Sequence, residues 1–402
     1  MERDLKAIEA FEICSIRPPS ENYSLTFRLT RNCGWNRCLF CPVYKLGARF
    51  SRRSVDEVKR DVDRAKRIDD LLGELGIHNA RLPVRTVYDR AAKLLEEINR
   101  AKGNRTDWTE PEGNDRTAAE GLAAADDGDD ERLRWFASWF KESPTVEDSL
   151  YHVLAWRMGG GETCFLGDAN SLLLTPGYFQ EVVRHIRSAF PTLNRFTIYG
   201  RTRSAAKKSL EELAAFRDAG LSRVHFGVES GSDAVLAFMR KGVTAVQHIE
   251  GCRKTKEAGI SCSVYVMPGL GGMDRSGEHA TETARVITEA QPDFVRLRTL
   301  EIFPKTGLAQ ALANGQFVEA TEEQVAEEIR TLVTNIRCAT VIASDSASNL
   351  LDVNGTLPAD RDRMLAVIDR YLSLSPREKL IFSFHSRLGS FVGQYGTVPP
   401  DI

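Results

Sequence analysis

Short apolar runs rich in β-branched and aromatic residues alternate with amphipathic segments along much of the chain. The segments Ser209–Gly220 and Ile249–Gly259 have apolar residues at helical spacing, and each ends in a glycine that suits a helix C-cap. Strand, helix and strand in this order predict right-handed crossovers and a parallel sheet. The expected strands are Tyr23–Arg31, Thr163–Asp168, Arg195–Gly200, Ser222–Ser230, Ile260–Gly269 and Asp293–Leu300.

The rest of the chain is expected to be mainly helical. Ser54 and Glu57 form a capping-box pattern before a helical apolar face. After Leu300, the segments 321–336 and 360–374 are amphipathic, so we expect helices packed against the open edge of the sheet. Asp345 and Asn349 are interpreted as helix caps near the mouth of the barrel.

The composition changes sharply from Arg105 to Glu131, where ten acidic residues accompany two basic ones. This pattern indicates a solvated, flexible insertion at about 103–131, between the first two strands; an acidic docking surface is the alternative. The aromatic stretch that follows, 132–140, predicts a helix packed on the body. We therefore divide the chain into an N-terminal extension (1–22), a core (23–307) and a helical C-terminal region (308–402).

The charge balance excludes several classes of protein. Lys plus Arg is 54 and Asp plus Glu is 56, so no field of one sign attracts nucleic acid or an anionic membrane. The chain has no apolar run near the ~20 residues of a membrane span, and its charged start does not resemble a signal peptide. These features predict a cytoplasmic protein with no membrane partner, and they argue against nucleic acid as a partner.

Three of the eight cysteines, Cys33, Cys38 and Cys41, lie within nine residues. In a reducing compartment such a group indicates a metal-binding or catalytic site. Thiolates favour zinc or the iron of an iron–sulfur cluster. Three of them would leave one iron of a cubane cluster open to a substrate, whereas a non-catalytic zinc or electron-transfer protein is the competing interpretation.

This cysteine group, preceded by a first strand, resembles that of the radical S-adenosylmethionine (SAM) superfamily. The superfamily usually has Cys-x3-Cys-x-aromatic-Cys; here Phe40 matches the aromatic, but the first gap, Gly34–Arg37, has four residues. The segment His225–Thr244 resembles the fourth-strand segment of many members, and Tyr265–Gly272 resembles the segment along adenine. The resemblance implies a partial (β/α)6 TIM-like barrel, with a mostly helical C-terminal extension and the acidic insertion between its first two strands.

The resemblance also implies the cofactors and their contacts. Cys33, Cys38 and Cys41 would hold a [4Fe–4S] cluster, and Glu229 would contact the ribose or amino-acid part of S-adenosyl-L-methionine. Arg201 and Arg240 could pair with its carboxylate or simply solvate helix starts. The expected cofactor-binding residues are Phe40, Gly167, Asp168, Asn170, Arg201, Glu229, Ser230, Arg240, Met267, Pro268 and Gly269.

The implied reaction is reductive cleavage of SAM to a 5′-deoxyadenosyl radical, which abstracts hydrogen from a small metabolite or a peptide. The partners would be that substrate and a reductant such as flavodoxin or ferredoxin. Arg296 and Arg298 share one face of the last predicted strand, so they either point into the barrel toward an anionic substrate or form a surface pair. A radical SAM enzyme that modifies tRNA or protein is the alternative.

Overall fold

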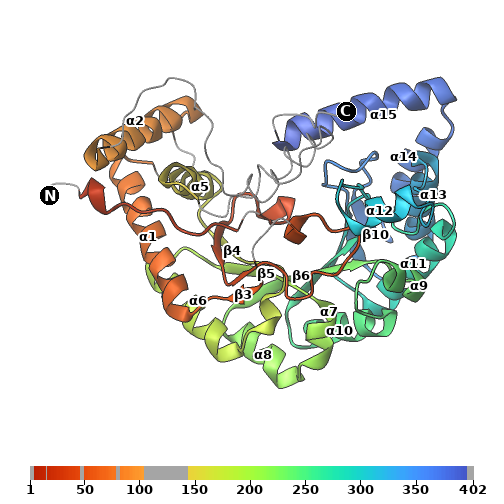
Figure 1. The fold of residues 1–402 in the computed structure, drawn as a ribbon, viewed down its shortest axis with the longest axis horizontal. Coiled ribbons are helices and arrows are strands. Elements are labelled where there is room, and N and C mark those ends of the chain that lie inside the picture. Colours follow the sequence, from red (N-terminus) through yellow and green to blue (C-terminus); the bar gives the residue numbers. More distant parts are fainter. Residues whose placement is uncertain (1–3, 15, 46–48, 78–81, 104–143, 396–402) are drawn as a thin grey trace.

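A mostly parallel sheet organises the molecule (Figure 1). The computed structural model describes residues 4–14, 16–45, 49–77, 82–103 and 144–395. Its main sheet has eight strands in the order β1-β4-β5-β6-β7-β8-β9-β10; neighbours from β1 to β9 are parallel, and β10 is antiparallel to β9. The strands are β1 (Leu25–Arg28), β4 (Thr163–Gly167), β5 (Arg195–Gly200), β6 (Leu221–Glu229), β7 (Ser261–Val266), β8 (Phe294–Leu297), β9 (Thr340–Ala343) and β10 (Gly355–Leu357).

Helices form an arc around the outer face of this sheet (Figure 1). Along the arc, α1, α6, α8, α10, α11, α13 and α14 pack in sequence against one another. The helices are α1 (Val55–Glu74), α2 (Val84–Lys102), α5 (Val146–Met158), α6 (Pro176–Ala189), α7 (Thr202–Lys207), α8 (Leu210–Asp218), α9 (Asp233–Phe238), α10 (Ala245–Glu257), α11 (Ser276–Ala290), α12 (Gly307–Ala313), α13 (Glu322–Asn335), α14 (Arg361–Leu372) and α15 (Pro376–Tyr395). This is a partial (β/α)6 barrel with a largely helical C-terminal region.

Local sequence signals explain where several helices begin and end. Ser54 and Glu57 form the expected capping box at the start of α1. Gly220 and Gly259 follow α8 and α10 with φ of 115° and 79°, a backbone conformation that glycine adopts at little cost. The alternating apolar residues of the strands, such as Val264, are fully buried against these helices.

The six predicted strands are confirmed as β1 and β4 to β8, with two differences. The first predicted strand is interrupted at Leu29, and its end, β2 (Thr30–Arg31), pairs instead with β3 (Ser51–Arg52). The C-terminal region, predicted to be mostly helical, adds β9 and β10. β9 has four residues and β10 has three, which is too short for an apolar–polar alternation to predict them.

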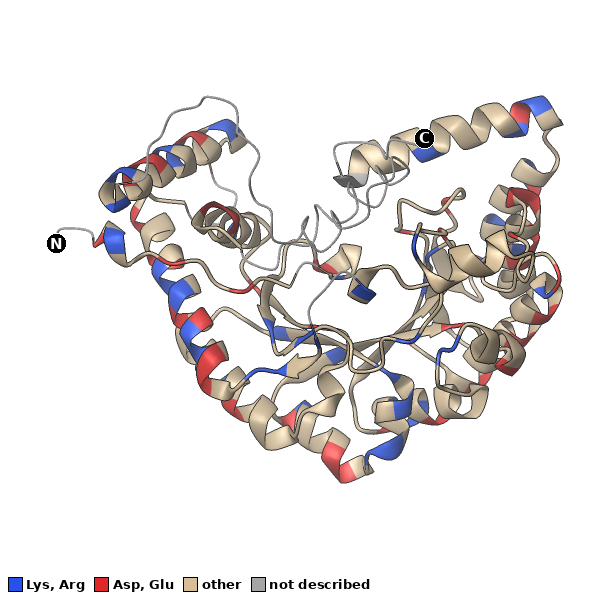
Figure 2. Cartoon of the chain, in the orientation of Figure 1, with Lys and Arg blue, Asp and Glu red and all other residues tan. Residues whose placement is uncertain are grey.

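The structure tests the remaining predictions only in part. The acidic insertion and the aromatic stretch lie outside the described residues, and the three domain boundaries stay predictions. None of the helices in the described ranges is both long and apolar enough for a membrane span. Acidic and basic residues are mixed along the outer helices (Figure 2). The cytoplasmic location stays a prediction.

Candidate functional site

The three cysteines lie on a loop that joins β2 to β3 beside the carboxyl end of the main sheet. Cys33, Cys38 and Cys41 are free thiols with partly exposed side chains. The antiparallel pairing of β2 with β3 brings the two ends of this loop together. Carboxyl ends of parallel strands are where α/β proteins bind ligands. The local fold thus presents the thiols at the edge where a site is expected.

The thiols are close enough to influence one another. Burial raises the pKa of Cys41 to about 11, the thiols of Cys38 and Cys33 add to this rise, and the backbone N–H of Tyr44 opposes it. The backbone N–H of Asn36 donates to Cys33 Sγ at 3.5 Å. N–H groups directed at sulfur stabilise the thiolate, which is the form that binds metal.

Three thiols on one loop are donors of the kind that hold an iron–sulfur cluster. Within the described ranges, no three Cys, His, Asp or Glu side chains converge on one ion position. In a [4Fe–4S] cluster each cysteine binds a different iron, so the sulfurs need not converge on a point. Cys33, Cys38 and Cys41 could therefore hold three irons of such a cluster.

Glu229 and Lys241 form an ion pair next to the cysteine loop. Glu229 ends β6 with φ of 64°, is 9% exposed, and accepts a hydrogen bond from Lys241 Nζ at 2.9 Å. The same ammonium group lies 5.6 Å from the ring centre of Phe40. Burial alone would lower the pKa of Lys241, but Glu229 and Cys38 raise it above the usual value. Lys241 thus connects the predicted carboxylate to the cysteine loop.

Arg201 lies beside the thiols, whereas the side chain of Arg240 is exposed. Burial lowers the pKa of Arg201, and the nearby thiol of Cys38 opposes this. The Arg201 guanidinium donates to the carbonyl of Lys241 and lies 4.8 Å from the ring centre of Trp35. Arg240 contributes its backbone carbonyl, which accepts a hydrogen bond from Trp35 Nε1 at 2.8 Å.

The carboxylate of Asp168, just after β4, is bound by groups of the protein itself. It accepts from Arg28 Nη2 at 2.7 Å, from the backbone N–H of Asn32 at 3.1 Å and from Cys14 Sγ at 3.3 Å. Because Asn32 precedes the first cysteine, Asp168 helps to fix the start of the cysteine loop. Any contact with SAM would add to this role.

Two neighbours of Asp168 also have structural contacts. A Cβ on Gly167 would lie 2.1 Å from Cys14 Sγ, so only glycine fits there. Asn170 accepts from the backbone N–H of Arg201 at 3.0 Å and donates to Ser204 Oγ at 2.9 Å. The amide of Asn170 thereby joins the ends of β4 and β5.

The residues after β6 and β7 are joined by a buried polar network. Ser230 Oγ lies 2.8 Å from His279 Nδ1, and His279 Nε2 lies 3.1 Å from the carbonyl of Met267. The backbone N–H of Gly269 donates to Glu328 Oε2 at 2.6 Å. Burial raises the pKa of Glu328 to about 7 and lowers that of His279 to about 4. The network anchors both strand ends on α11 and α13.

A second apolar cluster, separate from the main core, packs against the last two cysteines. Cys38 and Cys41 contact it, and Phe40 and Met267 belong to it. The carbonyl of Pro268, next to Met267, accepts a hydrogen bond from the backbone N–H of Leu300 at 2.9 Å. The other members are Val235, Met239, Leu270, Leu300, Leu308, Ala311 and Phe317. This cluster restricts the access of water to one side of the thiols.

Arg296 faces the inside of the barrel. Its neighbours on β8, Val295 and Leu297, belong to the core shared with the outer helices, so the alternation of the strand puts Arg296 on the inner face. Arg296 is 5% exposed and pairs with Asp345. Arg298, two residues further, is partly buried.

The helix-cap interpretation of Asp345 and Asn349 is wrong, because both lie in the loop between β9 and β10. Asn349 instead completes the end of β8. Its Oδ1 accepts from the backbone N–H of Thr299 at 2.9 Å, and its Nδ2 donates to the carbonyl of Leu297 at 2.7 Å.

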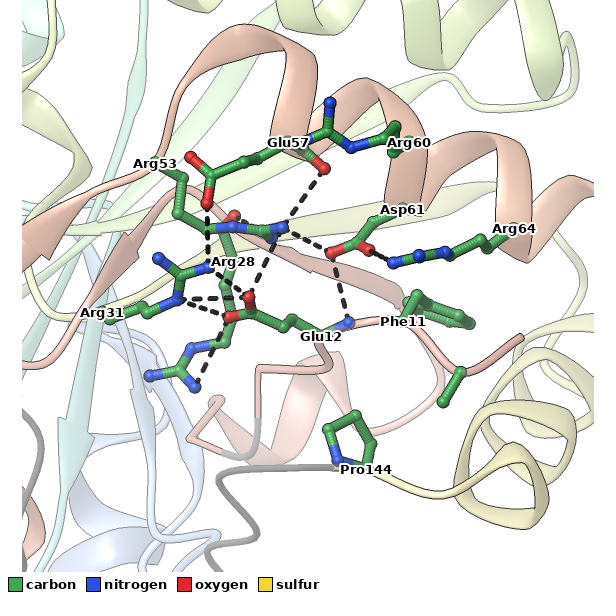
Figure 3. Close-up of a pocket in the computed structure, with 11 residues that line it drawn as sticks. Phe11, Glu12, Arg28, Arg31, Arg53, Glu57, Arg60, Asp61, Arg64 and Pro144 are labelled. Atoms are coloured by element: carbon green, nitrogen blue, oxygen red, sulfur yellow. Dashed lines mark hydrogen bonds and ion pairs between the residues drawn. The ribbon is translucent and has the colours of Figure 1, made fainter.

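A pocket of about 550 Å³ lies beside the base of the cysteine loop (Figure 3). At its centre, Glu12 pairs with Arg31, with Arg53 at 3.5 Å and with Arg28 at 3.9 Å. Asp61 on α1 pairs with Arg53 at 2.7 Å. These alternating charges tie the N-terminal segment and α1 to β1 and β2. The pocket is lined by Ala10, Phe11, Glu12, Arg28, Arg31, Arg53, Glu57, Arg60, Asp61, Arg64 and Pro144.

The comparison with known families agrees with this geometry. Residues 134–284 match the model of the radical SAM superfamily. This part of the chain is a radical SAM domain. The match spans β4 to β7, including Glu229 and Met267, while the cysteine loop precedes it. Radical SAM enzymes use a [4Fe–4S] cluster and SAM.

Individual proteins of known function or structure match the chain only in part. Over 113 residues it is 27% identical to the tRNA uridine(34) acetyltransferase of Methanocaldococcus jannaschii, covering 27% of this chain and 20% of that protein. Among solved structures, the Elp3 of Methanocaldococcus infernus is 17% identical over 59% of each chain, with a TM-score of 0.39. The coproporphyrinogen III oxidase of Escherichia coli is 16% identical over 42% of this chain and 39% of that chain, with a TM-score of 0.36. The chain thus spans about a fifth of the curated relative.

The predicted site residues include Arg240 but neither its neighbour Lys241 nor Trp35, both of which lie in or beside the cysteine loop in the structure. Lys241 follows Arg240, and two adjacent cations give no sign of which one turns inward. Trp35 lies in the unusual four-residue gap between the first two cysteines. That extra length was the available signal, but only the tertiary structure shows what the tryptophan contacts.

Proposed function

We propose that this chain is a radical SAM enzyme in which Cys33, Cys38 and Cys41 bind a [4Fe–4S] cluster. A cluster held by these thiols would supply the electron for reductive cleavage of SAM to methionine and a 5′-deoxyadenosyl radical, and that radical would take hydrogen from a small metabolite or peptide substrate. The observation that carries the proposal is the cysteine loop beside the Glu229–Lys241 pair at the carboxyl end of a parallel sheet. A reductant such as flavodoxin or ferredoxin is the second partner.

The protein's own residues have three tasks in this proposal. The ammonium of Lys241 and the guanidinium of Arg201 offer cations for the methionyl carboxylate. Glu229, at the strand end, accepts hydrogen bonds from ribose hydroxyls or from the methionyl ammonium. The apolar cluster around Phe40 and Met267 keeps water away from this side of the site, which strengthens its electrostatic interactions.

The decisive experiment is anaerobic reconstitution with iron and sulfide, reduction with dithionite, and measurement of 5′-deoxyadenosine by chromatography. We expect SAM-dependent formation of this product by the wild type and none by a variant with all three cysteines replaced by alanine. A preparation that carries about four irons per chain but never cleaves SAM would overturn the proposal.

The tRNA-modifying alternative is supported by the partial match to a tRNA uridine(34) acetyltransferase. It predicts an affinity for tRNA that falls steeply with salt concentration. Filter binding with bulk tRNA at two salt concentrations tests it. Saturable, salt-sensitive binding would favour a tRNA substrate, and its absence would favour a small metabolite or peptide.

A further inference from the structure

We propose that Trp35 is a positioning residue, which fastens the cysteine loop to the turn that carries Lys241. This turn, Met239–Gly242, directly follows α9. The inference rests on the proposed function, because it assigns a role within the same site. Its structural part, the attachment of the loop, can be measured without SAM cleavage.

The tryptophan contacts the turn through both its N–H and its ring. Trp35 Nε1 donates to the carbonyl of Arg240 at 2.8 Å. A Cβ on Gly242, where φ is 68°, would lie 2.1 Å from the ring, so the indole occupies the space that a side chain would need. The guanidiniums of Arg201 and Arg37 lie 4.8 and 5.2 Å from the ring centre. Cations at these distances are attracted to an indole ring.

The second half of the cysteine loop is attached to the same turn. The backbone N–H of Leu39 donates to the carbonyl of Met239 at 3.0 Å. The ammonium of Lys241 lies 5.6 Å from the ring centre of Phe40. The Met239–Gly242 turn thus holds the loop on both sides of Cys38.

This arrangement gives the four-residue first gap a function. The gap contains Trp35, whose indole reaches the carbonyl of Arg240, and the next residue along the turn is Lys241. The backbone of Lys241 is therefore held by Trp35 and by Arg201, while its ammonium reaches Glu229. Loss of the indole would leave the three thiols in the chain but loosen their position relative to Lys241 and Arg201.

The test compares Trp35→Ala and Trp35→Phe with the wild type. Trp35→Phe keeps an aromatic ring but removes the hydrogen bond and the outer part of the indole that contacts Gly242. Val246→Ala, at an exposed position on α10, is the matched control. Three quantities are measured: iron per chain, the electron paramagnetic resonance spectrum of the reduced protein at increasing SAM concentration, and kcat and KM for 5′-deoxyadenosine formation.

We expect Trp35→Ala to bind as much iron per chain as the wild type. It should need about ten- to hundredfold more SAM, both for the spectral change and for 5′-deoxyadenosine formation. Losses of this size are typical when groups that orient metal ligands are removed. Trp35→Phe should lie between it and the wild type, and Val246→Ala should match the wild type. If Trp35→Ala fails to bind iron, the test uses Trp35→Phe instead. A KM for SAM above that of the wild type supports the proposal, and an unchanged KM overturns it. A SAM dependence of Trp35→Ala equal to that of the wild type also overturns it.

A double-mutant cycle with Gly242→Ala tests the attachment itself. Because the added methyl group would overlap the indole, Gly242→Ala should lower the urea midpoint of unfolding more in the wild type than in the Trp35→Ala background. Equal shifts would overturn the attachment. A wild type that never cleaves SAM would overturn the proposed function, while this cycle would still report on the loop.

Discussion

At the residue scale, a few partly buried side chains make up the candidate site. Three thiols share one loop, and the ammonium of Lys241 stands between Glu229 and Phe40. The pairing of Lys241 with Glu229 matters because both side chains are largely removed from water. A lone charge in such a place is costly unless a ligand or a partner neutralises it.

Replacing any one of Cys33, Cys38 and Cys41 by serine should abolish stable cluster binding, because thiolate is the preferred ligand of iron–sulfur clusters. Iron analysis after anaerobic reconstitution should give well under half of the wild-type content. Cys338→Ser is the control, since Cys338 is also a partly exposed free thiol but lies far along the chain. Equal iron losses in all four variants would contradict a cysteine-specific site.

Replacing Lys241 by methionine should destabilise the cluster-free protein by about 3 kcal/mol, because Glu229 would remain as a largely buried, unpaired charge. Urea denaturation measures this change. The double variant Lys241→Met, Glu229→Gln removes both charges and should recover part of the loss. A single variant as stable as the wild type would show that the pair has no such role.

At the level of elements, the ends of β6 and β7 depend on helices that lie behind them. Ser230 and Met267 both meet His279 on α11, and Gly269 meets Glu328 on α13. Glu328 is 3% exposed. These contacts hold the strand ends from which the proposed SAM contacts emerge.

Glu328 should make stability depend on pH. Burial raises its pKa to about 7 from an ordinary value of 4.5, so the folded state favours the neutral carboxyl. The stability that this preference contributes is complete below pH 4.5 and is lost as the pH rises through about 7, a loss on the order of 3 kcal/mol. Urea unfolding between pH 4.5 and 8 should show the stability of the wild type falling by this amount relative to that of Glu328→Gln, a difference in which the contribution of the buried histidines cancels. Glu327→Gln, at an exposed position on the same helix, should behave as the wild type.

At the scale of the whole molecule, segments distant in the sequence meet at the base of the cysteine loop. One chain of ion pairs runs from Asp61 on α1 through Arg53 to Glu12 in the N-terminal segment (Figure 3). Glu12 in turn pairs with Arg31 on β2. The side chains of Arg53 and Asp61 are almost fully buried. The position of the cysteine loop therefore depends on the N-terminal segment and α1, to which no role in the proposed reaction is assigned.

Asp61→Asn should destabilise the protein by about 3 kcal/mol or more, because it leaves the buried guanidinium of Arg53 without its nearest carboxylate. Asp63→Asn, on the exposed side of the same helix, should change stability by less than about 0.5 kcal/mol. Thermal or urea unfolding of both variants gives the comparison. Similar losses in the two would mean that the network does not stabilise the fold.

Much of this architecture could be predicted because its signals are local. The runs Thr163–Asp168 and Arg195–Gly200 match β4 and β5 almost residue by residue, since buried parallel strands are short apolar runs bounded by turns. The prediction of a capping box at Ser54 was also correct, because this motif is local too. By contrast, β9 and β10 are stabilised by pairing at the sheet edge rather than by a local pattern.

We could predict the strand–helix alternation, the cysteine group and the carboxylate at the end of β6 without coordinates, because spacing and periodicity act within a few residues. The tertiary structure decided which charges are paired: that Lys241 rather than Arg240 reaches Glu229, that Arg28 and Asn32 bind Asp168, and that Trp35 meets Gly242. The direction of a side chain depends on partners that folding brings from distant segments, and no local pattern encodes them.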